Sequence, residues 1–146
     1  NEIKSSGRIF FTVGNMEYLK HGGRIGKVAS VAGSLLGIKP IITLKEGEIF
    51  PSGIGRSRRK TVDKTIDLLL AYLAEEKTDI ADYSICIGYG YDKEEAVEFR
   101  DRLVSRLKEK EYDIDTIPIF QIGATIGVHT GPYPLGIGVV KKSIRE

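Results

Sequence analysis

The pair of amphipathic segments at residues 61–76 and 93–110 constrains the fold most strongly. In each segment, apolar side chains recur at helical spacing along one face, and charged side chains occupy the rest of the surface. The run 83–87 between them alternates in the way that is typical of a strand with one buried face. We therefore expect two helices packed against one sheet.

Other segments supply the remaining strands of that sheet. Residues 8–13 are rich in aromatic and β-branched side chains, and residues 39–44 and 49–51 flank a tight turn containing Gly47. Further strands are expected at 114–120 and 136–141. With 146 residues and one hydrophobic core, residues 1–146 are expected to form a single domain. The predicted fold class is α/β: a two-layer α/β sandwich, with a mixed sheet and amphipathic helices packed on it.

Two glycine-containing regions interrupt this pattern. Asn15 is placed to cap a short helix over 16–21 that Gly22-Gly23 ends, and apolar spacing over 25–36 predicts a second helix, capped by Gly37. Residues 121–138 hold five glycines and two prolines, which predicts an ordered loop. A loop of this length in a compact domain is usually functional.

Composition excludes several classes of protein. With 41% hydrophobic and 29% charged residues, the chain is expected to fold, and a net charge of +2 implies no general attraction to nucleic acid or anionic lipid. Apolar runs are too short to cross a bilayer, and the first residues lack a signal-peptide core, so we expect a soluble, cytoplasmic protein without a transmembrane segment. The single cysteine, Cys86, is expected to be a small buried residue within a strand.

Two polar residues in glycine-rich surroundings are candidates for anion binding. Arg24 stands between glycines at a helix start, where backbone N–H groups and a guanidinium could face one carboxylate or phosphate. His129 lies in the glycine-rich segment, where an imidazole can donate to an oxyanion. The alternatives are a solvated arginine beside a helix end and a histidine that only satisfies loop carbonyls. The two histidines have no metal-site spacing, and the sequence has no Gly-x-Ser-x-Gly nucleophile motif, so neither a metal site nor a catalytic residue is predicted.

The only dense basic run is Arg56-Ser57-Arg58-Arg59-Lys60, just before the first long helix. It could contact phosphate, nucleic acid or an acidic protein surface, or remain a solvated charge run. Its surroundings contain no nucleic-acid-binding motif, so we favour a protein-docking surface over nucleic acid.

Three separated segments resemble the DegV family of bacterial fatty-acid-binding proteins, in matching order and spacing. They are Phe11-Thr12-Val13 followed by Met16 to Ile25, Gly33 to Ile41, and Ile122-Gly123 through Gly127-Val128-His129-Thr130-Gly131-Pro132. The likeness covers essentially the whole chain but only the C-terminal domain of that family, whose members are roughly twice this length. By this resemblance, the N-terminal domain is absent from the chain.

The resemblance implies half of a two-domain site for a long-chain fatty acid, with no cofactor. Arg24 and His129 would bind the fatty-acid carboxylate, supported by Gly23, Thr130 and Gly131. A separate fatty-acid kinase subunit would phosphorylate the bound acid for phospholipid synthesis, so this chain would not itself be an enzyme. Arg56, Arg58 and Arg59 would dock that kinase. The alternatives are a regulatory or nucleic-acid-binding protein that uses the basic run, and an unidentified small-molecule enzyme.

Overall fold

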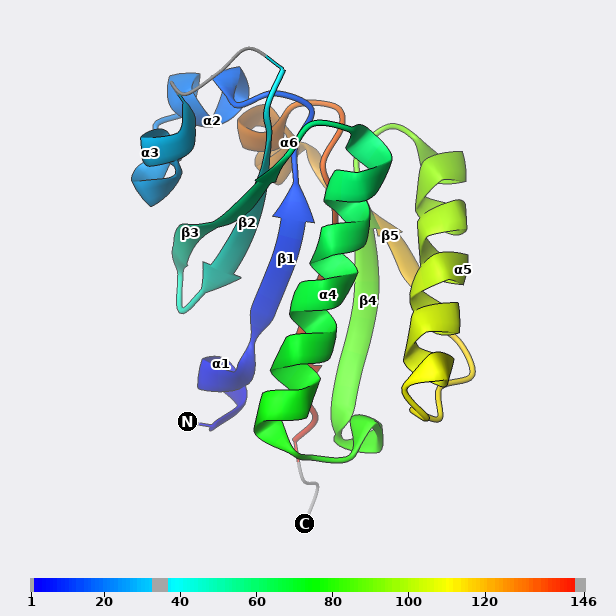
Figure 1. The fold of residues 1–146 in the computed structure, drawn as a ribbon. Helices are drawn as coiled ribbons and strands as arrows, with labels where there is room; N and C mark the ends of the chain where they lie inside the picture. Colours follow the sequence, from blue (N-terminus) through cyan, green and yellow to red (C-terminus); the bar gives the residue numbers. More distant parts are fainter. Residues whose placement is uncertain (1, 33–36, 144–146) are drawn as a thin grey trace.

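The computed structural model describes residues 2–32 and 37–143, and it contains a six-stranded sheet in the order β3-β2-β1-β6-β4-β5 (Figure 1). The strands are β1 (Arg8–Thr12), β2 (Lys39–Lys45), β3 (Glu48–Gly55), β4 (Tyr83–Tyr89), β5 (Ile119–Gln121) and β6 (Leu135–Lys141). Neighbouring strands are antiparallel except β4 and β5, which are parallel, so the sheet is mixed. The β2–β3 hairpin turns at Glu46 and Gly47, both with positive φ, as a two-residue primed turn requires.

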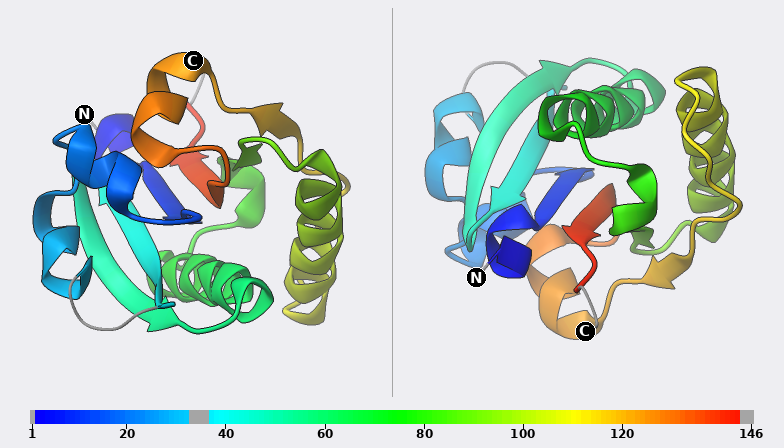
Figure 2. Two further views of the ribbon diagram at one scale, coloured as in Figure 1. Left: turned by 90° about the horizontal axis from the view of Figure 1, so that it is seen from above. Right: turned by 90° about the horizontal axis from the view of Figure 1, so that it is seen from below.

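Two long helices, α4 (Arg58–Glu76) and α5 (Lys93–Glu109), cover one face of this sheet (Figures 1 and 2). Their apolar faces meet inward-facing strand residues in the main core, which includes Ile66, Leu69, Phe99, Ile87 and Ile137. Asp92 caps α5 by accepting a hydrogen bond from the Glu95 amide at 3.0 Å. The predicted fold class is confirmed: an α/β fold with a mixed sheet and amphipathic helices packed on it.

Short helices lie on the opposite face of the sheet, at one end (Figure 2). They are α2 (Glu17–His21), η1 (Gly26–Val28), α3 (Ala29–Ala32) and α6 (Ala124–Thr130), whereas α1 (Glu2–Ser6) and η2 (Ile80–Asp82) lie near the other end (Figure 1). A second, smaller core forms beneath the first group from Val13, Leu19, Val28 and Ile42. Because these helices are short, they leave part of this sheet face uncovered.

The structure differs most from the sequence-based expectation in the glycine-rich segment 121–138. It was expected to be a loop, but it contains α6 and the start of β6. The glycine at position 127 has low helix propensity, but α6 packs against α2, and this tertiary contact outweighs the local preference.

Other differences concern the ends of elements. A strand is expected at 114–120, but the observed strand, β5, covers only Ile119–Gln121. Helix α4 begins at Arg58, inside the basic run, because the Ser57 side chain caps its first turn. The expected helix over 25–36 appears as a 3-10 turn followed by α3, and residues 33–36 lie outside the described residues. Cys86 was expected to be buried but is only partly so, because it faces the uncovered side of the sheet.

Candidate functional site

A groove of about 750 Å³ lies on the uncovered sheet face, between the α2–η1 region and α6. Its floor is the sheet itself, and its apolar lining includes Ile9, Phe11, Leu44, Ile49, Ile122 and Ile126. Four charged or polar residues also line it: Arg24, Lys27, Glu48 and His129. The groove is therefore a largely apolar surface with a few polar groups, the usual composition of a small-molecule site.

The position of Arg24 is determined by the way in which α2 ends. Gly23 adopts φ +65°, its amide donates to the Lys20 carbonyl at 3.1 Å, and the Arg24 amide donates to the Leu19 carbonyl at 2.8 Å. These paired bonds form a Schellman motif, which turns the chain sharply out of the helix. The exposed Arg24 guanidinium donates to the Gly22 carbonyl at 2.9 Å through Nη1 and lines the groove.

His129 comes from α6, about one hundred residues further along the chain. Its Nδ1 is buried without a hydrogen-bond partner among the described residues, and a side chain at Gly22 would collide with this atom. The reverse contact also exists, because Gly131, at φ +74°, leaves room for the Tyr18 ring of α2. We call Gly22-Gly23, at the end of α2, and His129-Thr130-Gly131, at the end of α6, the two glycine motifs. They pack against each other, which holds α2 and α6 together.

The structure places the predicted residues as follows. Arg24, His129, Gly23 and Thr130 all line the same groove, whereas Gly131 is buried behind it against Tyr18. Arg24 and His129, which come from distant parts of the sequence, therefore line one groove, and their joint binding of one anion stays a prediction.

Sequence reasoning missed the residues that form the floor of the groove. Cys86 and Gly88 on β4, and Gly136 and Gly138 on β6, all line it. One sequence pattern could have indicated this floor: β4 and β6 each carry small residues at alternate positions, where a sheet usually carries larger side chains. Burial raises the pKa of the Cys86 thiol, and a hydrogen bond with the Gly138 backbone opposes this rise. The rise in pKa favours the neutral thiol over the nucleophilic thiolate.

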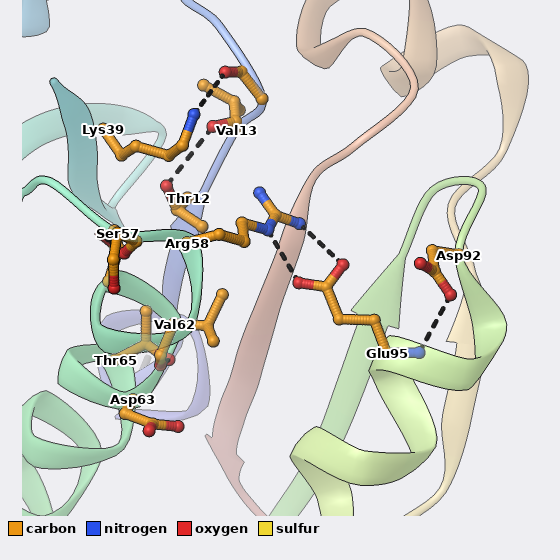
Figure 3. Close-up of polar contacts among 12 residues, drawn as sticks. Thr12, Val13, Lys39, Ser57, Arg58, Val62, Asp63, Thr65, Asp92 and Glu95 are labelled. Atoms are coloured by element: carbon orange, nitrogen blue, oxygen red, sulfur yellow. Dashed lines mark hydrogen bonds and ion pairs between the residues drawn. The ribbon is translucent and has the colours of Figure 1, made fainter. Parts of the chain in front are cut away.

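The basic run lies at the same end of the molecule but outside the groove. Arg58 is half-buried, and its Nε and Nη2 donate to the two Glu95 carboxylate oxygens at 2.7 and 3.3 Å (Figure 3). Its third nitrogen points away from Glu95, towards the end of β1 (Figure 3), and is buried without a partner among the described residues. Arg56 and Arg59 are exposed. Arg58 therefore joins two helices, while its neighbours present free charge to solvent.

A second hollow of about 520 Å³ lies beside this ion pair, lined by Lys39, Arg58, Asp92 and Glu95 among others. Thr130 lines both this hollow and the groove, so the two are neighbours. Within residues 2–32 and 37–143, no group of three or more histidine, cysteine or acidic residues is placed to hold a metal ion. Over the same ranges, none of the helices combines the length and apolar character needed to cross a membrane.

The fold and the groove together define a class of binding domain. An apolar floor can bury a hydrocarbon body, and a guanidinium or an imidazole in the lining can donate hydrogen bonds to an anionic end group. The arrangement suits an elongated amphiphile better than a compact polar metabolite.

Comparison with known proteins agrees with this class. The family described as "Uncharacterised protein, DegV family" matches residues 1–142. A DegV domain-containing protein of Clostridium perfringens is 37% identical over 143 residues, covering 98% of this chain and 47% of the relative. The chain therefore belongs to the DegV family, and it spans about half the length of the curated relatives that it matches.

Solved structures extend the comparison to bound ligands. A stearic-acid-binding protein of Eubacterium ventriosum is 45% identical with a TM-score of 0.86, covering 97% of this chain and 46% of that one. A fatty-acid-binding DegV family protein of Thermus thermophilus is 27% identical with a TM-score of 0.79, covering 93% and 46%. The fold of this chain thus matches about half of each of these proteins.

Proposed function

We propose that this chain is the C-terminal domain of a two-domain protein that binds a long-chain fatty acid. The observation that carries the proposal is that Arg24 and His129 both line one largely apolar groove. The relatives whose structures bind fatty acids support the ligand class. The missing half of the site would come from the N-terminal domain, because each relative is about twice as long.

In this proposal Arg24 and His129 bind the carboxylate. Arg24 has further N–H groups to offer beyond its bond to the Gly22 carbonyl, and His129 brings an imidazole to the same groove. Gly23 sets the direction of Arg24, while Thr130 and Gly131 support His129 from the end of α6. A carboxylate in an apolar site requires such donors, because an unpaired buried charge costs several kcal/mol.

We also infer that the bound acid is passed to a separate fatty-acid kinase, which transfers phosphate to the carboxylate for phospholipid synthesis. The binding domain supplies no catalytic group in this reaction and needs no cofactor. Since the kinase uses ATP, we expect the protein to act in the cytoplasm. Arg56, Arg58 and Arg59 would form the docking surface for the kinase, next to the rim of the groove.

The ligand assignment is tested by lipid extraction of the full-length protein. Mass spectrometry of the solvent extract is expected to identify a long-chain fatty acid bound to purified protein. Repeated recovery of none, together with no binding of added fatty acid in titrations, would contradict the proposed function.

The roles of Arg24 and His129 are tested by substitution. Arg24→Ala and His129→Ala in the full-length protein are each expected to weaken fatty-acid binding about tenfold to a hundredfold. A hydrogen bond to a charged group contributes about 1.5–3 kcal/mol, and every 1.4 kcal/mol is about a factor of ten. Lys20→Ala is the matched control, because Lys20 is an exposed cation on α2 that does not line the groove. Equal effects of Arg24→Ala and Lys20→Ala would remove Arg24 from the carboxylate site.

A further inference from the structure

The floor of the groove is built from residues that lie in rows across the sheet. Strand register joins Ile49, Leu44, Ile9, Gly138 and Cys86 into one continuous row over β3, β2, β1, β6 and β4. All five residues line the groove. A second row, closer to α6, contains Phe11, Gly136 and Gly88. The two rows lie roughly 7 Å apart, the distance between alternate residues of a strand.

Side-chain size falls steeply along each row. Positions over β1, β2 and β3 carry isoleucine, leucine or phenylalanine, whereas positions over β6 and β4 carry only glycine or cysteine. We therefore expect the groove to be deepest over β6 and β4, where Ile122 lies close to Gly88.

Packing between strands excludes a side chain at one of these glycines and leaves little room for one at a second. A side chain at Gly136 would collide with Phe11 and the Phe10 carbonyl, so β1 itself requires that glycine. A Cβ at Gly138 would meet only the Cys86 sulfur, at 3.1 Å, and a Cβ at Gly88 would meet only Ile122, at 3.4 Å. The Cys86 sulfur thus lies close above Gly138, and Ile122 lies in contact range above Gly88, while all of these residues line the groove.

Over β6 and β4, the floor ends at the next row, further from α6. There β6 carries Val140 and β4 carries Ser84, which are paired in register on the same face of the sheet. Neither residue lines the groove, and Ser84 is exposed. The row of Gly138 and Cys86 is therefore the last part of the groove before a branched side chain raises the floor.

We propose that Cys86 and Gly138 determine how long an acyl chain the site accepts. This inference rests on the proposed function. With the carboxylate at Arg24 and His129, the acyl tail runs along β6 and β4 over Gly136 and Gly88. Its methyl end reaches the row of Gly138 and Cys86, where the size of residue 86 sets the remaining depth. Cys86 acts here through its volume and not through thiol chemistry.

The test compares acyl-length preference in full-length variants. Cys86→Leu is expected to lower the affinity for the longest saturated fatty acid that the wild type binds by about tenfold. That loss corresponds to about two methylenes without burial, at about 0.8 kcal/mol each. Acids shorter by about two carbons or more should keep their affinity, because their tails do not reach residue 86. Cys86→Val provides a smaller change in the same direction if the leucine variant fails to fold.

Ser84→Leu is the matched control, because it makes the same kind of change on the same strand face, one row beyond the groove. It is expected to leave the length preference unchanged. An unchanged preference in folded Cys86→Leu and Cys86→Val, or an equal loss for acids of every length, would overturn the inference. Failure of the wild type to bind any fatty acid would instead contradict the proposed function.

Discussion

At the scale of single residues, adjacent glycines at the end of α2 have different tasks. Gly22 has an ordinary φ of −77°, but a side chain there would collide with the His129 imidazole. Gly23 has φ +65° and nothing within 4 Å of its missing side chain. A glycine is therefore required at position 22 by the contact with His129. At position 23 it is required by the positive φ of the turn that directs Arg24.

Substituting each glycine with alanine separates these two tasks. Gly22→Ala is expected to move the imidazole, which should change the NMR signals of His129 and weaken fatty-acid binding. Gly23→Ala is expected to lower the free energy of unfolding by about 1 kcal/mol, because alanine is disfavoured at positive φ. Urea unfolding and histidine NMR of both variants provide the measurements. Identical effects of the two variants would show that this division is wrong.

At the scale of elements, three ion pairs join α4 to α5. Arg58–Glu95, Arg102–Asp63 and Arg106–Asp67 have N–O distances of 2.7, 2.8 and 2.7 Å. The side chains of the Arg58–Glu95 pair are 26% and 25% exposed, compared with 36% and 59% for Arg106–Asp67. Water screens the exposed pair more strongly, so the first pair should contribute more to stability.

Arg58→Met is therefore expected to destabilise the domain by about 1–2 kcal/mol, since it leaves the half-buried Glu95 carboxylate without its partner. Arg106→Met should cost less than about 0.5 kcal/mol. Thermal and urea unfolding of the two variants and of Glu95→Gln measure the difference. Equal, small effects of Arg58→Met and Arg106→Met would show that the Arg58 pair has no special structural role.

At the scale of the whole molecule, the order of strands brings the two glycine motifs together. Strands β1 and β6 are neighbours and antiparallel, so the end of β1 lies beside the start of β6. Helix α2 follows β1, and α6 precedes β6, which places both helices at the same end of the sheet (Figure 1). The basic run 56–60 leads into the first turn of α4 at this end too. The proposed kinase-docking surface and the proposed fatty-acid site therefore lie at the same end of the molecule.

The docking proposal is tested best with the exposed arginines, because Arg58 is engaged by Glu95. The double variant Arg56→Ala, Arg59→Ala is expected to leave fatty-acid affinity unchanged. Its KM in acyl-phosphate formation by the kinase should rise about threefold to tenfold, since charges at the rim of an interface chiefly affect association. Lys110→Ala, an exposed cation beyond the far end of α5, is the control. Weakened fatty-acid binding with an unchanged KM would reverse the assignment.

Local sequence patterns determined most of the elements. The apolar periodicities of α4 and α5, the alternation of β4, the turn at Gly47 and the glycine end of α2 each depend on neighbours within a few residues, and the structure confirms them. Helix α6 was not predictable in this way, because its stability depends on packing against α2, about one hundred residues away in the chain.

The groove itself was decided by tertiary structure. Alternation along β4 and β6 indicates which residues share a face, but it cannot indicate which face the long helices will cover. Cys86 was therefore assigned to the core although it lines the groove. The sequence alone determined that Arg24 and His129 lie beside glycines that allow close approach. Only the pairing of β1 with β6 placed them at one groove, because that pairing joins segments that no local interaction connects.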